Sequence, residues 1–246
     1  MLRLFRKFRQ QEISQVNLAK YILYAIGEIL LVVIGILIAI QINNWVEEKN
    51  DRVQEQKYLN NFHDNLERDS ENLEFRITNL SEALTIIDTV IEQMSVESPE
   101  GDVSELIGPL YMATFILVIE RSTIEDLKST GNLDLITNEQ LTEALLTYYL
   151  DIEGDGLIFS QSLVEYSRNT IGPYLMKYYR FKLGPIGAQI PIQTEHMITY
   201  EKLKNDIFLI NALIYRKGIL SASKEAYVRA LERNKNLRML VASELD

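Results

Sequence analysis

The sequence predicts an all-α protein in which an N-terminal transmembrane helix is followed by an elongated antiparallel helical bundle. An unbroken apolar run lies near the N-terminus, and most of the remaining chain places apolar residues at helical spacing. Only 11 glycines and 5 prolines occur among 246 residues, so few positions favour turns and long helices are expected. We expect a basic cytoplasmic tail at 1–20, a transmembrane signal anchor at 21–44, and a helical domain at 45–246 with a membrane-proximal stalk.

The apolar run extends from Tyr21 to Ile42 and contains one formal charge, at Glu28. At about 1.5 Å per residue such a helix reaches ~33 Å, which is sufficient for a hydrocarbon core of roughly 30 Å. A core helix of a soluble protein would show a polar face, which this run lacks apart from Glu28 and Gln41. The alternative of a cleaved signal peptide is disfavoured, because the run ends in a poor cleavage site. The sequence therefore predicts an uncleaved anchor.

The charges that flank the run predict its direction. Five basic residues and one acidic residue precede it, whereas no positive excess follows it, so the N-terminus is expected inside the cytoplasm and the C-terminal domain outside. Trp45 follows the run at a position suited to an interfacial aromatic residue. The tail contains four further candidates for membrane contact, which could bind anionic lipids: Arg3, Arg6, Lys7 and Arg9. In the simpler interpretation, the tail only sets the topology.

Glu28 requires an explanation, because a carboxyl group in a membrane is costly unless it is neutral, paired or in contact with protein. On a helix, Gly35 and Ala39 fall within about 20° of Glu28. Their small-xxx-small spacing lets two helices approach closely. We expect this face to bind a partner span or a second copy of the chain, or to form a proton-linked site. The alternative is a protonated Glu28 that water reaches from the inner leaflet.

After the anchor, helical patterns dominate the chain. An apolar residue recurs at most seventh positions and predicts an amphipathic helix of about fifty residues, with Asp69 and Arg76 interrupting a second stripe. The repeating residues are Trp45, Leu59, Leu66, Leu73, Leu80, Ile87 and Met94. Two further helices are expected, one from Val103 to Glu120 and one from Thr123 to a left-handed cap at Gly131. The next should extend from Thr137 to Leu150 and end at 153–156. Two more are expected, over 157–182 with a kink at Pro173 and from Ile198 to Glu244 with a possible break at Gly218. The first and last helices can pair antiparallel. The buried stripes of the last helix are expected at Leu203, Ile207, Ile210, Ile214, Val228, Leu231, Leu237 and Leu240.

Two segments carry a resemblance to a known family. One is KYILYAIGEILLVVIGILIAIQINNWVEE with the following QKYLNNFHDNLERD, and the other is TIEDLKSTGNLDLITNEQLTEALLTYY at 123–149. Both resemble an uncharacterised Bacteroidota family of single-pass membrane proteins, the domain of unknown function 6090. The resemblance implies a bacterial inner membrane with the helical domain in the periplasm. It implies no reaction.

The residue inventory offers little chemistry. The absence of cysteine excludes disulfides, thiolate nucleophiles and cysteine-bound metals. His63 and Glu67 have the spacing of a metal pair, but they and His196 are better explained as solvated residues. We predict no catalytic, cofactor-binding or metal-binding residue, no cofactor and no enzymatic activity. The acidic domain is a poor nucleic-acid binder. A group of tyrosines could line a ligand site or belong to the core: Tyr148, Tyr149, Tyr166, Tyr174, Tyr178 and Tyr179.

Two functions therefore remain open. The favoured one is a single-pass membrane protein whose extracytoplasmic helical domain acts as an interaction or scaffold module, with membrane lipids and a protein partner or a second copy as its contacts. The alternative is a ligand-binding, sensor-like module. Because the cytoplasmic tail is too short for an output domain, such a sensor would act through a partner protein.

Overall fold

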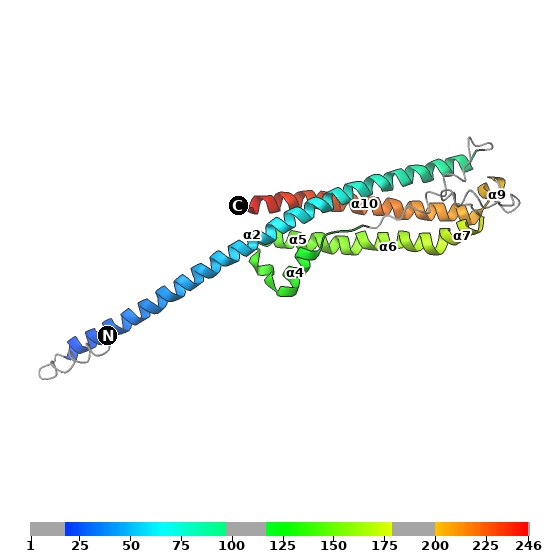
Figure 1. Cartoon of the computed structure of the whole chain (residues 1–246). Helices are drawn as coiled ribbons and strands as arrows, with labels where there is room; N and C mark the ends of the chain where they lie inside the picture. The colour runs from blue at the N-terminus through cyan, green and yellow to red at the C-terminus, as the bar shows by residue number, and fades with distance from the viewer. Residues whose placement is uncertain (1–17, 97–116, 179–199, 246) are drawn as a thin grey trace, which may run out of the picture. The chain divides into compact units, whose positions relative to one another are not determined.

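The structure is a computed structural model that describes residues 18–96, 117–178 and 200–245. Within these ranges all regular structure is helical, as Figure 1 shows, and the predicted all-α class is confirmed. The chain divides into two compact units, Met1–Gln54 and Glu55–Asp246. The division falls inside the longest helix, α2, which extends over Leu18–Met94.

The part of α2 that belongs to the first unit is apolar and exposed. An 18-residue window in it has a mean hydropathy of 2.7, and none of that window is buried. Among the described helices it is the one that is long and apolar enough to cross a membrane. This helix occupies the predicted anchor.

From Glu55 on, α2 forms one side of the helical core. Its residues at every seventh position are fully buried, as predicted from the periodicity: Leu59, Leu66, Leu73, Leu80 and Ile87. Residues of the neighbouring stripe pack against this core in partly buried positions, namely Ile77, Leu84 and Ile91. Apart from the buried Asp69, the charged residues between them are exposed or half-buried, so the core here follows the amphipathic pattern.

The next described residues, 117–121, form a non-helical segment. It is followed by α4 (Ser122–Thr130) and the short 3₁₀-helix η1 (Asn132–Leu135). The predicted helix up to Glu120 is therefore wrong for residues 117–120, and residues 103–116 lie outside the described ranges. The helix breaks here because three side chains of the bundle bind this backbone, as described below. The predicted left-handed cap is confirmed, with φ of 73° at Gly131.

The third part of the bundle is a continuous helical column with two wide turns. It consists of α5 (Glu139–Asp151), the π-helical turn η2 (Ile152–Gly156), α6 (Leu157–Tyr166), the π-helical turn η3 (Ser167–Ile171) and α7 (Gly172–Tyr178). The predicted helix end at 153–156 is wrong, because burial of the first and last residues of η2, Ile152 and Gly156, keeps this stretch helical. The kink expected near the proline takes the form of η3, which ends two residues before it.

The caps of α4 and α5 also differ from the prediction. The hydroxyl of Thr123 does not cap α4 but accepts a hydrogen bond from Asn65 Nδ2 at 2.8 Å. At the start of α5 the capping side chain is Asn138, which accepts the N–H of Leu141, and not Thr137. The main chain and hydroxyl of Thr137 donate instead to the buried carboxylate of Glu55, at 2.7 and 2.8 Å. In each case a tertiary contact with α2 replaces the expected local cap.

The last helical stretch is divided into α9 (Tyr200–Lys204) and α10 (Ile207–Glu244), because Asp206 caps the second helix through the N–H groups of Phe208 and Leu209. Gly218 does not interrupt α10. Three predicted core residues are wrong, since Ile207, Ile214 and Val228 are exposed. The buried stripe lies on another face and comprises Leu209, Leu213, Arg216, Leu220, Ser223, Tyr227, Asn234, Leu237 and Val241.

Contacts within the second unit establish the directions of its helices. Gln56 binds the main chain of Glu244 at one end of the α2–α10 pair, and Asp88 binds Lys217 towards the other. These two helices are therefore antiparallel, as predicted. The column α5–α7 also runs opposite to α10 and in the same direction as α2 (Figure 1).

Candidate functional site

The four candidate residues of the first unit that the structure describes are Glu28, Gly35, Ala39 and Trp45. All are exposed, and a Cβ atom added at Gly35 would meet no atom within 4 Å. The indole of Trp45 lies 5.8 Å from the Lys49 ammonium. The four basic candidates of the tail, Arg3, Arg6, Lys7 and Arg9, lie outside the described residues. The proposed face of the anchor is thus open to a lipid or a second helix.

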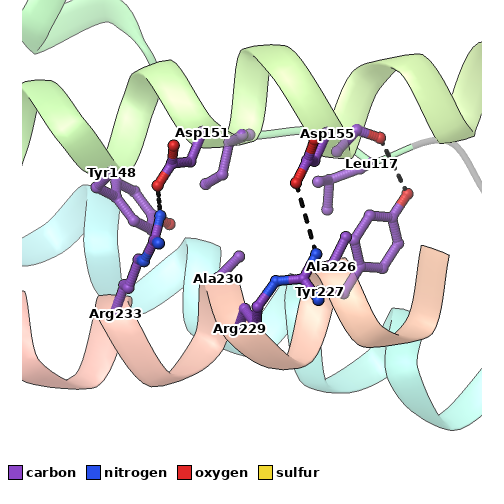
Figure 2. Close-up of a pocket in the computed structure, with 11 residues that line it drawn as sticks. Leu117, Tyr148, Asp151, Asp155, Ala226, Tyr227, Arg229, Ala230 and Arg233 are labelled. Carbon is purple, nitrogen blue, oxygen red and sulfur yellow. Dashed lines mark hydrogen bonds and ion pairs between the residues drawn. The ribbon is translucent and has the colours of Figure 1, made fainter. Parts of the chain in front are cut away.

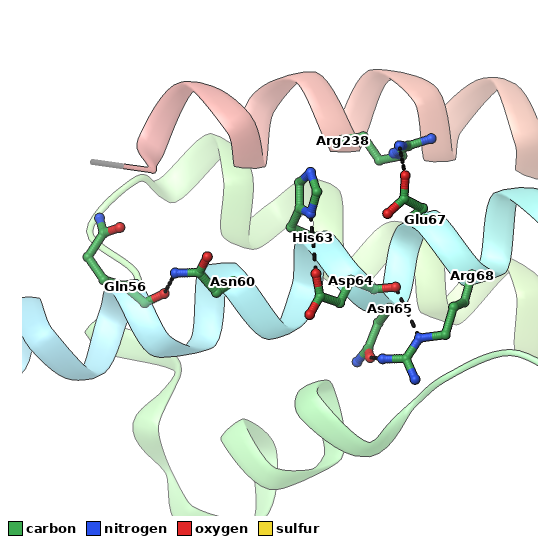
Figure 3. Close-up of polar contacts among 8 residues, drawn as sticks. All are labelled: Gln56, Asn60, His63, Asp64, Asn65, Glu67, Arg68 and Arg238. Carbon is green, nitrogen blue, oxygen red and sulfur yellow. Dashed lines mark hydrogen bonds and ion pairs between the residues drawn. The ribbon is translucent and has the colours of Figure 1, made fainter.

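The possible metal pair does not form. Figure 3 shows His63 beside Asp64, with Nδ1 and Oδ1 3.4 Å apart, whereas Glu67 points to Arg238 on α10 at 3.2 Å. Within the described ranges, no cluster of three or more acidic or histidine side chains has the geometry of a metal site. His196 lies outside these ranges.

The described side chains of the predicted tyrosine group belong to the core or pack against it. Tyr148, Tyr149 and Tyr166 are buried, and the rings of the first two meet edge to face at 5.1 Å. Tyr166 donates its hydroxyl to the main-chain oxygen of Ala212, and Tyr174 donates to Asp206. The side chain of Tyr178 and the whole of Tyr179 lie outside the described part. These rings fill space between helices and do not surround a wide ligand cavity.

A small cavity does lie between η2 and α10, and two ion pairs close its rim (Figure 2). Asp151 pairs with Arg233, and Asp155 pairs with Arg229 at 3.5 Å. The cavity exists because its lining includes the small residues Gly156, Ala226 and Ala230. Gly156 packs closely against Leu117, since a Cβ atom added at Gly156 would lie 3.1 Å from the Leu117 side chain. The cavity measures about 70 Å³. Ligand pockets usually span roughly 300–1,000 Å³, so this one has room for water or a molecule of a few atoms.

The wall of this cavity includes Tyr148, which also belongs to a buried polar network. The Tyr148 hydroxyl donates to Asp69 Oδ2 at 3.2 Å and accepts from Asn234 Nδ2 at 3.1 Å. Asn234 also donates to the main-chain oxygen of Leu66, and Asp69 Oδ1 accepts the N–H of Glu120 at 2.9 Å. The network therefore joins α2, the non-helical segment 117–121, α5 and α10.

The non-helical segment is bound through its backbone by side chains of two helices. Asp69 accepts the N–H of Glu120, Asn72 donates to the oxygen of Val118, and Ser160 of α6 accepts the N–H of Leu117. A buried backbone without helical bonds needs such partners. These three contacts replace the hydrogen bonds that a helix would have made.

Burial dominates the electrostatics of the network. It raises the pKa of Asp69 from 3.8 to about 6, against the smaller opposing effect of the hydrogen bonds from Glu120 and Tyr148. It also raises the pKa of Tyr148, so that its hydroxyl stays protonated. One signal of this network is present in the sequence, because Asp69 interrupts an apolar stripe of α2. Asn234 gave none, since its stripe was assigned to another face of the helix.

Charge is distributed unevenly over the three helical parts. α10 has seven basic and three acidic residues, and it forms ion pairs with both neighbours. The pairs with α2 and with the α5–η2 region are Lys217–Asp88, Lys235–Glu74, Arg238–Glu67, Arg229–Asp155 and Arg233–Asp151. Because these side chains are partly exposed, each pair adds little stability. Together, however, the five pairs favour the observed register in which basic α10 packs on its two acidic neighbours, α2 and the α5–η2 region.

One comparison with known proteins bears on the chain. Residues 28–107 match DUF6090, a family of unknown function. The predicted resemblance to this family is thereby confirmed, although the second segment that suggested it, 123–149, lies outside the matched range. No curated protein and no solved structure matches the chain. The DUF6090 segment begins at Glu28 and includes Gly35, Ala39 and Trp45, as well as Asp69 of the buried network.

Proposed function

We propose that this chain is a single-pass protein of the bacterial inner membrane and that its helical unit serves as a periplasmic interaction or scaffold module. The observation that supports the membrane assignment best is the exposed apolar stretch of α2. An 18-residue window with a mean hydropathy of 2.7 has no buried share. A soluble protein rarely exposes so large an apolar surface, and lipid would cover it without any further protein.

The scaffold role rests on the chemistry of the second unit. Several buried polar groups in its described part bind one another across the helices, as the contacts of Asp69 and Glu55 illustrate. Such an arrangement fixes the positions of helices, which suits a rigid module that holds a partner. In this proposal the protein performs no reaction.

We place the partner contact of the anchor at the face of Glu28, Gly35 and Ala39. Close packing needs small residues there, so Gly35→Leu should weaken association with a partner span or a second copy. Gly27→Leu provides a matched control, because Gly27 lies roughly 80° away from Gly35 around the helix and is equally open. Affinity purification of the full chain in a gentle detergent, followed by protein mass spectrometry, tests the proposal.

A defined membrane complex, or a homo-oligomer, that is lost in Gly35→Leu and retained in Gly27→Leu would support the scaffold. A monodisperse monomer without partners in all three samples would contradict it. The sensor-like alternative is favoured by the cavity beneath the Asp151–Arg233 and Asp155–Arg229 pairs. Small-molecule mass spectrometry of the same sample tests that alternative, which requires a bound compound small enough for about 70 Å³.

A further inference from the structure

The second unit contains a buried carboxylate in an unusual environment. Asp69 is 1% exposed, and its two oxygens accept hydrogen bonds from a main-chain N–H and a tyrosine hydroxyl. Both donors are neutral, and no ion pair of Asp69 occurs among the described residues. A carboxylate that is removed from water without a cation loses hydration that neutral donors replace only in part, so that its protonated form is favoured.

The charged and titratable groups that face Asp69 do not neutralise it. On α2, Arg68 binds the oxygens of Asp64 and Asn65. On the non-helical segment, Arg121 binds two other carboxylates, and Glu120 adds a negative charge nearby. On α5 the neighbours are the hydroxyls of Tyr148 and Tyr149, and α10 contributes the neutral amide of Asn234.

We propose that Asp69 is a proton-binding site that fastens the non-helical segment 117–121 to the bundle more tightly in acid than at neutral pH. One proton from solvent binds Asp69 Oδ2. Oδ1 continues to accept the N–H of Glu120, and the new hydroxyl on Oδ2 donates to the Tyr148 oxygen. The Tyr148 hydroxyl proton then turns towards the cavity that this residue lines, which has room for water.

The direction of the effect follows from the protonation equilibrium. Burial raises the pKa of Asp69 in the folded chain from 3.8 to about 6. The folded state therefore binds this proton more tightly than the unfolded state. The stability that protonation adds is fully present below a pH of about 4 and is lost as the pH rises through about 6. The segment is thus held tightly at pH 5 and more loosely at pH 7.5.

Two features make the site more than a buried acid. Asp69 contacts the segment and α5 directly, and α10 through Tyr148 and Asn234, so a change in its charge alters the contacts of three elements. The segment also leads directly into α4, whose Thr123 and Asp126 bind α2. Proton release would therefore favour opening of the segment and of α4, and would expose the α2 surface beneath them. This inference concerns the second unit and does not depend on the side of the membrane it occupies.

Hydrogen exchange of the full chain in detergent micelles tests the proposal. The protection of peptides that contain residues 117–121 would be measured at pH 5 and 7.5, after correction for the intrinsic exchange rate. The histidines would be replaced in the background by His63→Gln and His196→Gln, because histidine is the residue type whose charge ordinarily changes between pH 5 and 8. We expect protection to be about tenfold greater at pH 5 than at pH 7.5, and the full effect of the pKa shift, about a hundredfold, to be reached only below a pH of about 4.

Asp69→Asn should abolish the pH dependence, because the amide cannot bind the proton, whereas Asp64→Asn, an exposed change on the same helix, should preserve it. Equal or lower protection at pH 5, or an unchanged dependence in Asp69→Asn, would overturn the proposal. Should Asp69→Asn fail to fold, carbon NMR of the unsubstituted chain labelled at aspartate Cγ decides the question. An aspartate that titrates near pH 6 supports the proposal, and titration of every aspartate below pH 5 refutes it.

Discussion

Adjacent tyrosines of α5 allow a sharp test of the buried network. Tyr148 and Tyr149 are 1% and 2% exposed, but only the hydroxyl of Tyr148 has hydrogen-bond partners within the described part of the structure. Tyr148→Phe removes the donor to the Asp69 carboxylate and the acceptor of Asn234. Tyr149→Phe removes a buried hydroxyl without a partner. Both substitutions keep the ring, so the difference between them isolates the hydroxyl groups.

The two effects should have opposite signs. A hydrogen bond to a charged group contributes about 1.5–3 kcal/mol, and its loss leaves the Asp69 carboxylate with the Glu120 N–H alone. We expect Tyr148→Phe to lower the free energy of unfolding by about 2–3 kcal/mol at pH 7.5. A buried unpaired hydroxyl is unfavourable by roughly 1–3 kcal/mol, so Tyr149→Phe should leave stability unchanged or raise it by up to about 1 kcal/mol.

Urea unfolding of the full chain in a mild detergent, followed by circular dichroism, measures both effects. For a domain of this size, about 1 kcal/mol corresponds to a shift of roughly 2–4 °C in melting temperature, so Tyr148→Phe should melt about 4–12 °C lower. At pH 5 its penalty should shrink, because Asp69 is then largely neutral. Equal destabilisation by both substitutions, or a larger effect of Tyr149→Phe, would show that the network is not the source of the stability.

Three further predictions concern the core, the ion pairs and the anchor. Leu73→Ala, at a fully buried position, should lower the free energy of unfolding by about 2–5 kcal/mol, whereas Phe75→Ala, at a side chain 60% exposed, should cost less than about 1 kcal/mol in the same urea titration. Raising NaCl from 0.05 to about 0.5 M should lower the stability of the unit by roughly 1–3 kcal/mol, since five partly exposed pairs hold α10; an increase would contradict their contribution. In a membrane two-hybrid assay of residues 1–50, Gly35→Leu should reduce association more than Glu28→Leu, and the reverse order would contradict close packing as the main term.

The sequence predicts α2 well because its pattern is simple. From Leu59 to Ile87 apolar residues occupy most of the buried positions, and charged residues other than Asp69 lie at exposed or half-buried ones, so periodicity identifies both the helix and its inner face. The apolar run at 21–42 is equally simple to interpret as a helix long and apolar enough to cross a membrane, since it contains one formal charge.

α10 shows why the same reasoning fails elsewhere. Its buried stripe has the three- and four-residue spacing of a helix core, but Arg216, Ser223 and Asn234 occupy positions in it. Ile207 and Ile214 lie on a neighbouring face and suggested a more apolar stripe there. Polar residues at core positions are stabilised by partners on other helices, such as the Leu66 oxygen for Asn234. Single-chain periodicity contains no information about those partners.

The non-helical segment and the turn η2 were missed for a related reason. Residues 117–120 have helix-compatible side chains, and only the tertiary contacts of Asp69, Asn72 and Ser160 bind their backbone in another form. The two glycines of η2 suggested a helix end, whereas burial of Gly156 against Leu117 and Tyr227 keeps the column helical. In both places tertiary packing, and not local helix propensity, determines the conformation of the backbone.

The proposal that the chain crosses a membrane once, with its helical unit outside the cytoplasm, is tested most directly by paired reporters at its C-terminus. Alkaline phosphatase is active only outside the cytoplasm, and green fluorescent protein exported in unfolded form fluoresces only inside it. Expressed in a Gram-negative bacterium, the phosphatase fusion should be active and the fluorescent fusion dark, with both in the membrane fraction. A fluorescent fusion together with an inactive phosphatase, or recovery of both in the soluble fraction, would contradict the account.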